Sequence, residues 1–171
     1  MKSSLWQRLD LLARSLWPFT LTLLLLIVSV VPLRIPYFAP ISPGFPLISV
    51  YYWAIHRPTI LPAPAVFLLG VLHDLLGGAP LGVGVLVLLI VYGVCTSLRR
   101  VFLGAPFTAV WFGFAVTAAG AAVVTWVITS LLFTEVLDPS ALIFSYLLTV
   151  GLYPAVGHLF ARAQRSLPQQ L

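Results

Sequence analysis

Charged residues are scarce in this chain, and their scarcity excludes several classes of protein. Among 171 residues, Lys and Arg together number 9 and Asp and Glu number 4, so only 8% of the residues are charged. A soluble domain carries about a quarter charged residues, and no segment of useful length here is polar enough to form one. The basic residues are too few for a nucleic-acid-binding surface. The single cysteine, Cys95, excludes an intramolecular disulfide.

Apolar residues make up 61% of the chain, in runs that approach or exceed the ~20 residues needed to cross a bilayer. We therefore predict an all-α integral membrane protein, a single domain of residues 1–171 with six transmembrane helices in one bundle. The predicted spans are residues 18–33, 44–56, 61–76, 81–98, 107–133 and 140–160. The second span is too short to cross alone, so it needs loop residues, a locally thinner bilayer or shelter by other helices. Residues 4–16 form an amphipathic segment typical of an interfacial helix.

The basic residues fall almost entirely on one predicted face of the membrane. Only Arg34 lies on the other face, beside the loop that holds Glu135 and Asp138. An excess of Lys and Arg marks the cytoplasmic side. The pattern therefore predicts a multi-pass membrane protein with both termini in the cytoplasm. The residues on the cytoplasmic face are Lys2, Arg8, Arg14, Arg57, Arg99, Arg100, Arg162 and Arg165.

Asp74 is an acidic residue inside the third predicted span, where an ionised carboxylate costs at least ~2.5–3.5 kcal/mol. Gly70 and Gly77 share its helix face and would let another helix come close. Asp74 lies near the outer end of the span, where it can cap the following turn or reach water. It can also make a buried polar contact that fixes the packing, including an ion pair with Arg34. A proton or ion relay is the weakest interpretation, because relays usually need a second membrane acid.

The fifth predicted span is unusually rich in small residues, and Gly113 and Gly120 are among them. Such surfaces let helices pack closely, either within the chain or against a partner's helix. Gly82 and Gly84 open the fourth span. Pro154 interrupts the sixth, where it should free a backbone carbonyl and kink the helix.

The sequence shows no constellation of residues that suits catalysis or metal binding. His73 neighbours Asp74 but points about 100° away on a helix, and no second His or Cys stands near it. No Ser/His/Asp arrangement, phosphate-binding loop or pair of carboxylates is present. We therefore expect no enzyme activity, no cofactor and no metal.

The segment from Ile48 to Gly93 resembles the MreD family of bacterial rod shape-determining proteins. The most specific part is a Gly-x-x-x-Asp pattern at Gly70 and Asp74, followed by a small turn. Gly84, just after this motif, stands where some relatives are expected to have a polar or larger residue. The matching residues are Tyr51-Tyr52-Trp53, His56-Arg57-Pro58, Phe67-Leu68-Leu69-Gly70, Asp74-Leu75-Leu76 and Pro80-Leu81-Gly82.

The resemblance implies a non-catalytic inner-membrane scaffold of the cell-elongation machinery. Such a protein binds the single-pass protein MreC and, in the same complex, MreB, RodA and a class B penicillin-binding protein, which couples MreB filaments to peptidoglycan synthesis. The family is also similar in fold to the substrate-binding subunits of energy-coupling-factor transporters, which supplies an alternative function as a small-molecule-binding subunit. The absence of an obvious polar set for a water-soluble vitamin favours the scaffold. The structural or partner-contact candidates are Arg34, Gly70, Asp74, Gly77, Pro80, Gly82, Gly113, Gly120 and Pro154.

Overall fold

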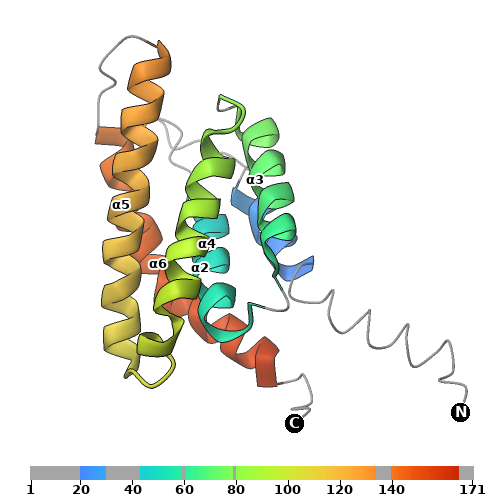
Figure 1. The fold of residues 1–171 in the computed structure, drawn as a ribbon, viewed down its shortest axis with the longest axis vertical. Coiled ribbons are helices and arrows are strands. Elements are labelled where there is room, and N and C mark those ends of the chain that lie inside the picture. Colours follow the sequence, from blue (N-terminus) through green and yellow to red (C-terminus); the bar gives the residue numbers. More distant parts are fainter. Residues whose placement is uncertain (1–19, 30–42, 59–60, 79, 134–139, 166–171) are drawn as a thin grey trace, which may run out of the picture.

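The computed structural model describes residues 20–29, 43–58, 61–78, 80–133 and 140–165 (Figure 1). Within these ranges the chain is helical apart from short turns and contains no β-strand, as the all-α prediction requires. An apolar helical segment, Thr20–Ser29, precedes five further helices. They are α2 (Phe45–His56), α3 (Ala63–Gly77), α4 (Val83–Phe102), α5 (Phe107–Phe133) and α6 (Ser140–Arg165).

The helix boundaries follow from proline and glycine. Proline occupies the first turn of both α2 and α3, where its missing N–H costs no hydrogen bond. Gly78 ends α3 with a φ of 66°, a left-handed conformation that glycine adopts without strain. By contrast, α4 continues through Arg99 and Arg100 to Phe102. The arginines end the apolar run without ending the helix, so the predicted fourth span is shorter than the helix.

Successive helices alternate in direction and form one bundle. In sequence order, α4 packs between α3 and α5, and α5 packs against α6 (Figure 1). The short helix α2 lies at the centre and contacts all four longer helices. Because α2, α4 and α6 run the same way, Arg57, Arg99, Arg100 and Arg162 lie at one end of the bundle. The α3–α4 turn lies at the opposite end.

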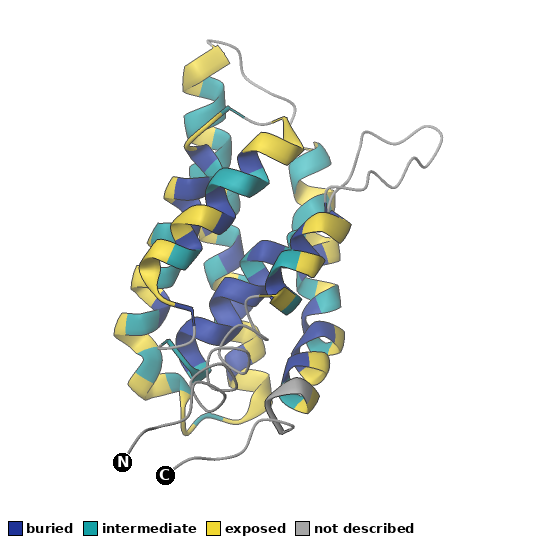
Figure 2. Ribbon diagram, turned by 90° about the vertical axis from the view of Figure 1, so that its right-hand side faces the viewer, coloured by how far each residue is buried: buried dark blue, intermediate teal, exposed yellow. Residues whose placement is uncertain are grey.

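The core is built around α2, in which every residue from Ile48 to Ile55 is buried (Figure 2). Tyr51 makes edge-to-face contacts with Phe114 of α5, at 5.1 Å between ring centroids, and with Tyr153 of α6, at 5.8 Å. Its hydroxyl donates a 2.9 Å hydrogen bond to the carbonyl of Val110. The aromatic run Tyr51-Tyr52-Trp53 therefore lies at the centre of the described helices.

Three helices are long and apolar enough to cross a membrane: Val83–Phe102, Phe107–Phe133 and the part of α6 from Ser140 to Arg162. Thr20–Ser29 and α3 are shorter apolar helices. A helix of 12 residues such as α2 rises only about 18 Å, so six complete crossings remain a prediction. The predicted interfacial helix, residues 4–16, and both ends of the first predicted span lie outside the described residues, as do Arg34, Glu135 and Asp138.

Candidate functional site

Asp74 caps the N-terminus of α4 from the neighbouring helix. Its side chain is fully buried, and its Oδ2 accepts a 2.8 Å hydrogen bond from the backbone N–H of Gly82. Oδ1 accepts from the N–H of Gly84 at 3.1 Å, and Oδ2 also lies 3.4 Å from the N–H of Val85. These are the N–H groups at a helix start that lack partners within the helix. A carboxylate there also faces the positive end of the helix dipole, which offsets the cost of burying the charge.

Asp74 takes this role because the N-cap residue itself has no side chain. A Ser or Asp at the N-cap would bond the second or third helical N–H, but the N-cap of α4 is Gly82, with a φ of 102°. Pro80 precedes it in the turn, and its carbonyl accepts the N–H of Val83 at 3.3 Å. Pro80 and Gly82 thus shape the turn that brings the start of α4 to Asp74. An ion pair of Asp74 with Arg34 stays a prediction, since Arg34 lies outside the described residues.

Glycines set the separation of α3 and α4. A Cβ at Gly70 would lie 2.6 Å from the Cα of Val85, and a Cβ at Gly84 would lie 2.1 Å from Oδ1 of Asp74. Both positions therefore need glycine for the two helices to approach this closely. Gly77, expected to serve the same purpose, has nothing within 4 Å of such a Cβ. The Gly70–Asp74 face of α3 is occupied by α4 of the same chain, and so it is not open to a partner.

The central helix α2 is tied at both ends by side chains of longer helices. At its N-terminus the N–H of Gly44 donates a 2.9 Å hydrogen bond to Oγ1 of Thr149 on α6. At its C-terminus Nε of Arg99 on α4 donates a 2.8 Å hydrogen bond to the carbonyl of Ile55. A cation beside terminal carbonyls also complements the helix dipole. Arg99 therefore has a structural role in addition to its predicted role in topology.

The small residues of α5 face two ways. A Cβ at Gly113 would lie 2.5 Å from the Phe102 ring and 2.9 Å from the Tyr51 hydroxyl, so this glycine serves the internal packing. Gly120 is exposed, with nothing within 4 Å of such a Cβ. It is therefore the member of this pair that is open to contact from outside.

Pro154 lies inside α6, which continues beyond it to Arg165. Because proline has no N–H, the carbonyl four residues earlier, that of Val150, loses its helical partner. Nε1 of Trp111 on α5 donates a 3.1 Å hydrogen bond to that oxygen. The carbonyl of Val150, which Pro154 leaves without a helical donor, therefore links α6 to α5 through Trp111.

An apolar groove of about 460 Å³ runs between α4 and α5. Its walls include Ile90, Val94 and Val116, which are 45%, 44% and 63% exposed. These exposures place the groove on the outer surface of the bundle. Its remaining lining residues are Val87, Val91, Leu98, Phe102, Gly113, Thr117, Gly120, Ala121 and Val124.

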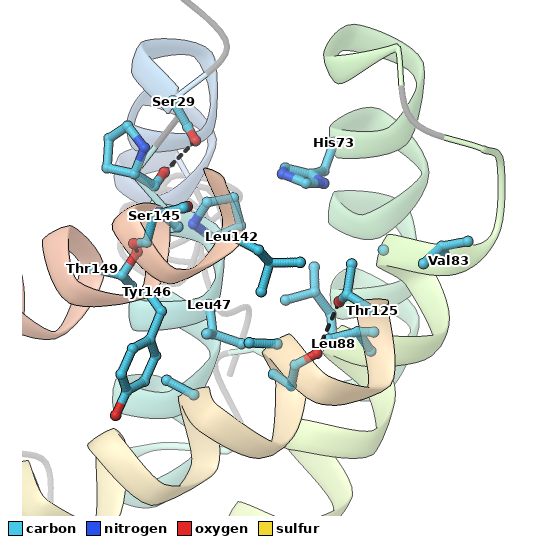
Figure 3. Close-up of a pocket in the computed structure, with 18 of the residues that line it drawn as sticks. Ser29, Leu47, His73, Val83, Leu88, Thr125, Leu142, Ser145, Tyr146 and Thr149 are labelled. Atoms are coloured by element: carbon cyan, nitrogen blue, oxygen red, sulfur yellow. Dashed lines mark hydrogen bonds between the residues drawn. The ribbon is translucent and has the colours of Figure 1, made fainter. Parts of the chain in front are cut away.

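A second cavity, of about 300 Å³, lies between the helices at the end opposite the arginines (Figure 3). The groove has one hydroxyl residue, Thr117, whereas this cavity gathers several hydroxyl groups together with His73 and Asp74. Nδ1 of His73 lies 3.6 Å from Oδ1 of Asp74 and has no hydrogen-bond partner among the described residues. Within those residues no three His, Cys, Asp or Glu side chains gather as metal ligands would.

Sequence reasoning identified Asp74, Gly70 and Pro154 but missed the residues that complete their contacts. Gly84 was expected to open the fourth span and to depart from the family pattern, but its contact with Asp74 was not predicted, although a glycine that opens a helix within reach of a carboxylate is a recognisable signal. Thr149 and Arg99 gave no signal, because their contacts with α2 join residues 105 and 44 positions apart in the chain.

Comparison with known proteins gives one family. The family model described as rod shape-determining protein MreD matches residues 10–163, which is most of the chain. No curated protein and no solved structure matches.

Proposed function

The chain belongs to the MreD family of rod shape-determining proteins, and we propose that it acts as a non-catalytic scaffold whose direct partner is MreC. Membership makes it a rod shape-determining membrane protein. The proposal adds that it holds MreC in the inner membrane within a complex that contains MreB, RodA and a class B penicillin-binding protein. In this way it would help couple MreB filaments to peptidoglycan synthesis.

The observation that carries this proposal is the apolar groove between α4 and α5. Its floor includes Gly120, where the absence of a side chain lets a second helix approach the backbone. Its rims carry exposed branched side chains, which can interdigitate with those of an incoming helix. A single apolar transmembrane helix, the membrane part of MreC, suits such a groove.

A second candidate surface for a partner, the Gly70–Asp74 face of α3, is excluded by the packing of the chain itself. The Gly70–Asp74 face of α3 is filled by α4. The partner-contact candidates lie on two helix faces, the Gly70–Asp74 face of α3 and the small-residue face of α5, and this leaves the outer face of α5 at Gly120.

Substitution of Gly120 by leucine tests the groove. We expect Gly120→Leu to lower the amount of MreC that co-purifies from native membranes by about tenfold, because the side chain fills the space of the partner helix. Rod-shaped cells that depend on this variant should become round. The measurement is quantitative co-purification alongside cell aspect ratio.

Gly151→Leu on α6 is the matched control. Gly151 is likewise an exposed helical glycine with nothing within 4 Å of a Cβ, but it lines neither the groove nor the cavity. It should retain MreC and rod shape. Equal retention of MreC by both variants would show that the groove is not the binding surface.

The alternative function, a small-molecule-binding subunit like those of energy-coupling-factor transporters, is favoured by the cavity of about 300 Å³, whose mostly apolar wall carries several polar side chains. No solved structure matches the chain, so likeness to those subunits stays an expectation. Native mass spectrometry separates the candidates: a retained single-pass protein supports the scaffold, and a transporter module that co-purifies in place of MreC supports the alternative.

A further inference from the structure

Polar side chains of an apolar chain converge on the cavity at the α3–α4 turn. They come from separate parts of the fold: Ser29 from the first helical segment, His73 and Asp74 from α3, Thr125 from α5 and Thr149 from α6. Figure 3 shows Ser29 and His73 on opposite sides of the cavity, with Thr125 below them. Polar groups within a membrane bundle usually mark a cavity that holds water or a ligand.

The hydroxyl groups of this cavity face it as hydrogen-bond acceptors. Ser29 donates its hydrogen to the carbonyl of Pro43 at 2.6 Å, Thr125 donates to Ala121 at 2.8 Å, and Thr149 donates to Ser145 at 2.6 Å. Each hydroxyl has one hydrogen and two lone pairs. With these hydrogens used by the backbone, the three oxygens can only accept further bonds, and one lone pair of Thr149 already accepts the N–H of Gly44. A ligand that bonds to these oxygens must therefore supply donors.

The charged side chains of the cavity also favour a ligand that donates hydrogen bonds. Its lining contains the carboxylate of Asp74 and the imidazole of His73 but no Lys or Arg among the described residues. An anionic ligand would therefore face the carboxylate of Asp74 without a counter-charge from the described residues. The rest of the wall is apolar and includes Leu47, Leu88 and Leu142.

We propose that this cavity binds a small amphiphile, neutral or cationic, whose hydroxyl or ammonium group donates to the polar set and whose apolar body lies among the leucines. Its volume of about 300 Å³ is at the lower limit of known ligand sites, which suits one ring with a short polar tail. This binding does not depend on the presence of MreC.

Three probes with the same phenyl body test the predicted chemistry: phenethylamine (cationic), 2-phenylethanol (neutral donor) and phenylacetate (anionic). The purified protein is titrated with each probe in detergent, and one-to-one adducts are followed by native mass spectrometry. We expect saturable adducts with the amine and the alcohol and binding at least about tenfold weaker for the acid. The absence of a saturable adduct with both donors, or equal binding of the acid, would overturn the proposal.

Neighbouring positions on α5 provide the matched variants. Ala122 lines the cavity, whereas Val123 is 60% exposed and lines neither cavity nor groove. We expect Ala122→Phe to abolish the adducts and Val123→Phe to keep them. Thr125→Val, which removes an acceptor without changing size, should weaken binding several-fold. Adducts that persist in Ala122→Phe would place binding elsewhere and contradict the proposal.

MreC co-purification from the same variants separates this inference from the proposed function. Ala122→Phe should retain MreC, which also shows that it folds. Adducts without MreC binding in the wild-type protein would refute the scaffold alone, and MreC binding without adducts would refute the ligand site alone.

Discussion

At the scale of single residues, Asp74 stabilises the fold although its carboxylate is buried in an apolar chain. A buried carboxylate is tolerated where its lone pairs are met by donors, and three backbone N–H groups at the start of α4 meet them here. The same bonds satisfy the helix start that Gly82 cannot cap. Removing the acid therefore harms α4 as well as the polar network, because both sets of groups lose their partners.

Replacement of Asp74 by leucine tests this cap. We expect Asp74→Leu to lower the free energy of unfolding by about 2–4 kcal/mol, since it leaves buried N–H groups without acceptors, and to reduce the yield of folded protein. The measurement is thermal unfolding in detergent. Asp74→Asn keeps one carbonyl acceptor in the same shape and should fall between leucine and the wild type. A melting temperature of Asp74→Leu equal to that of the wild type would contradict the cap.

The sequence was sufficient to show that Asp74 needs a partner, because its cost in a membrane span follows from composition alone. It was not sufficient to identify the partner. The backbone N–H groups of Gly82 and Gly84 reach Asp74 only at the particular register of α3 against α4, and the close approach at Gly70 sets that register. Such a register is a tertiary property, which no local pattern contains.

At the scale of elements, α3 and α4 behave as one unit joined by glycines. The Cα of Val85 lies 2.6 Å from where a Cβ on Gly70 would be, so this contact between α3 and α4, the seam, leaves no room for a methyl group. The neighbouring α2 is too short to cross a bilayer alone and is held at its two ends by Thr149 and Arg99. Its hydropathy predicted a span, and its position at the centre of the bundle could not be read from the sequence, because a buried helix and a lipid-facing one are both apolar.

A pair of alanine substitutions tests the seam. We expect Gly70→Ala to lower the free energy of unfolding by about 1–3 kcal/mol, because the added methyl group pushes against the backbone of α4. Gly77→Ala, on the same helix with open space around it, should leave stability unchanged or slightly higher, since alanine favours the helix. Thermal unfolding of both variants measures the difference. If Gly77→Ala lowered the free energy of unfolding as much as Gly70→Ala, the close packing of α3 against α4 would not explain the effect at Gly70.

At the scale of the whole molecule, the alternating helices bring the arginines of α4 and α6 and the residue after α2 to one end. Arg57, Arg99, Arg100 and Arg162 share that end, although they are far apart in the sequence. The opposite end carries the α3–α4 turn and the polar cavity. The positions of the basic residues between the apolar runs predicted that these arginines share one end of the bundle. The end at which each arginine lies depends only on how many times the chain has reversed direction before it. From the positive-inside rule we predict that the arginine end faces the cytoplasm and that the cavity lies toward the outer face.

Two exposed leucines at opposite ends of α4 test this orientation. Leu81, 70% exposed, lies in the turn before α4, and Leu103, 53% exposed, lies just after it. In a background where the buried Cys95 is replaced by alanine, we expect a membrane-impermeant maleimide to label Leu81→Cys in intact spheroplasts. Leu103→Cys should be labelled only after the membrane is permeabilised. The reverse pattern would invert the protein in the membrane, and labelling of both from outside would show that α4 does not cross.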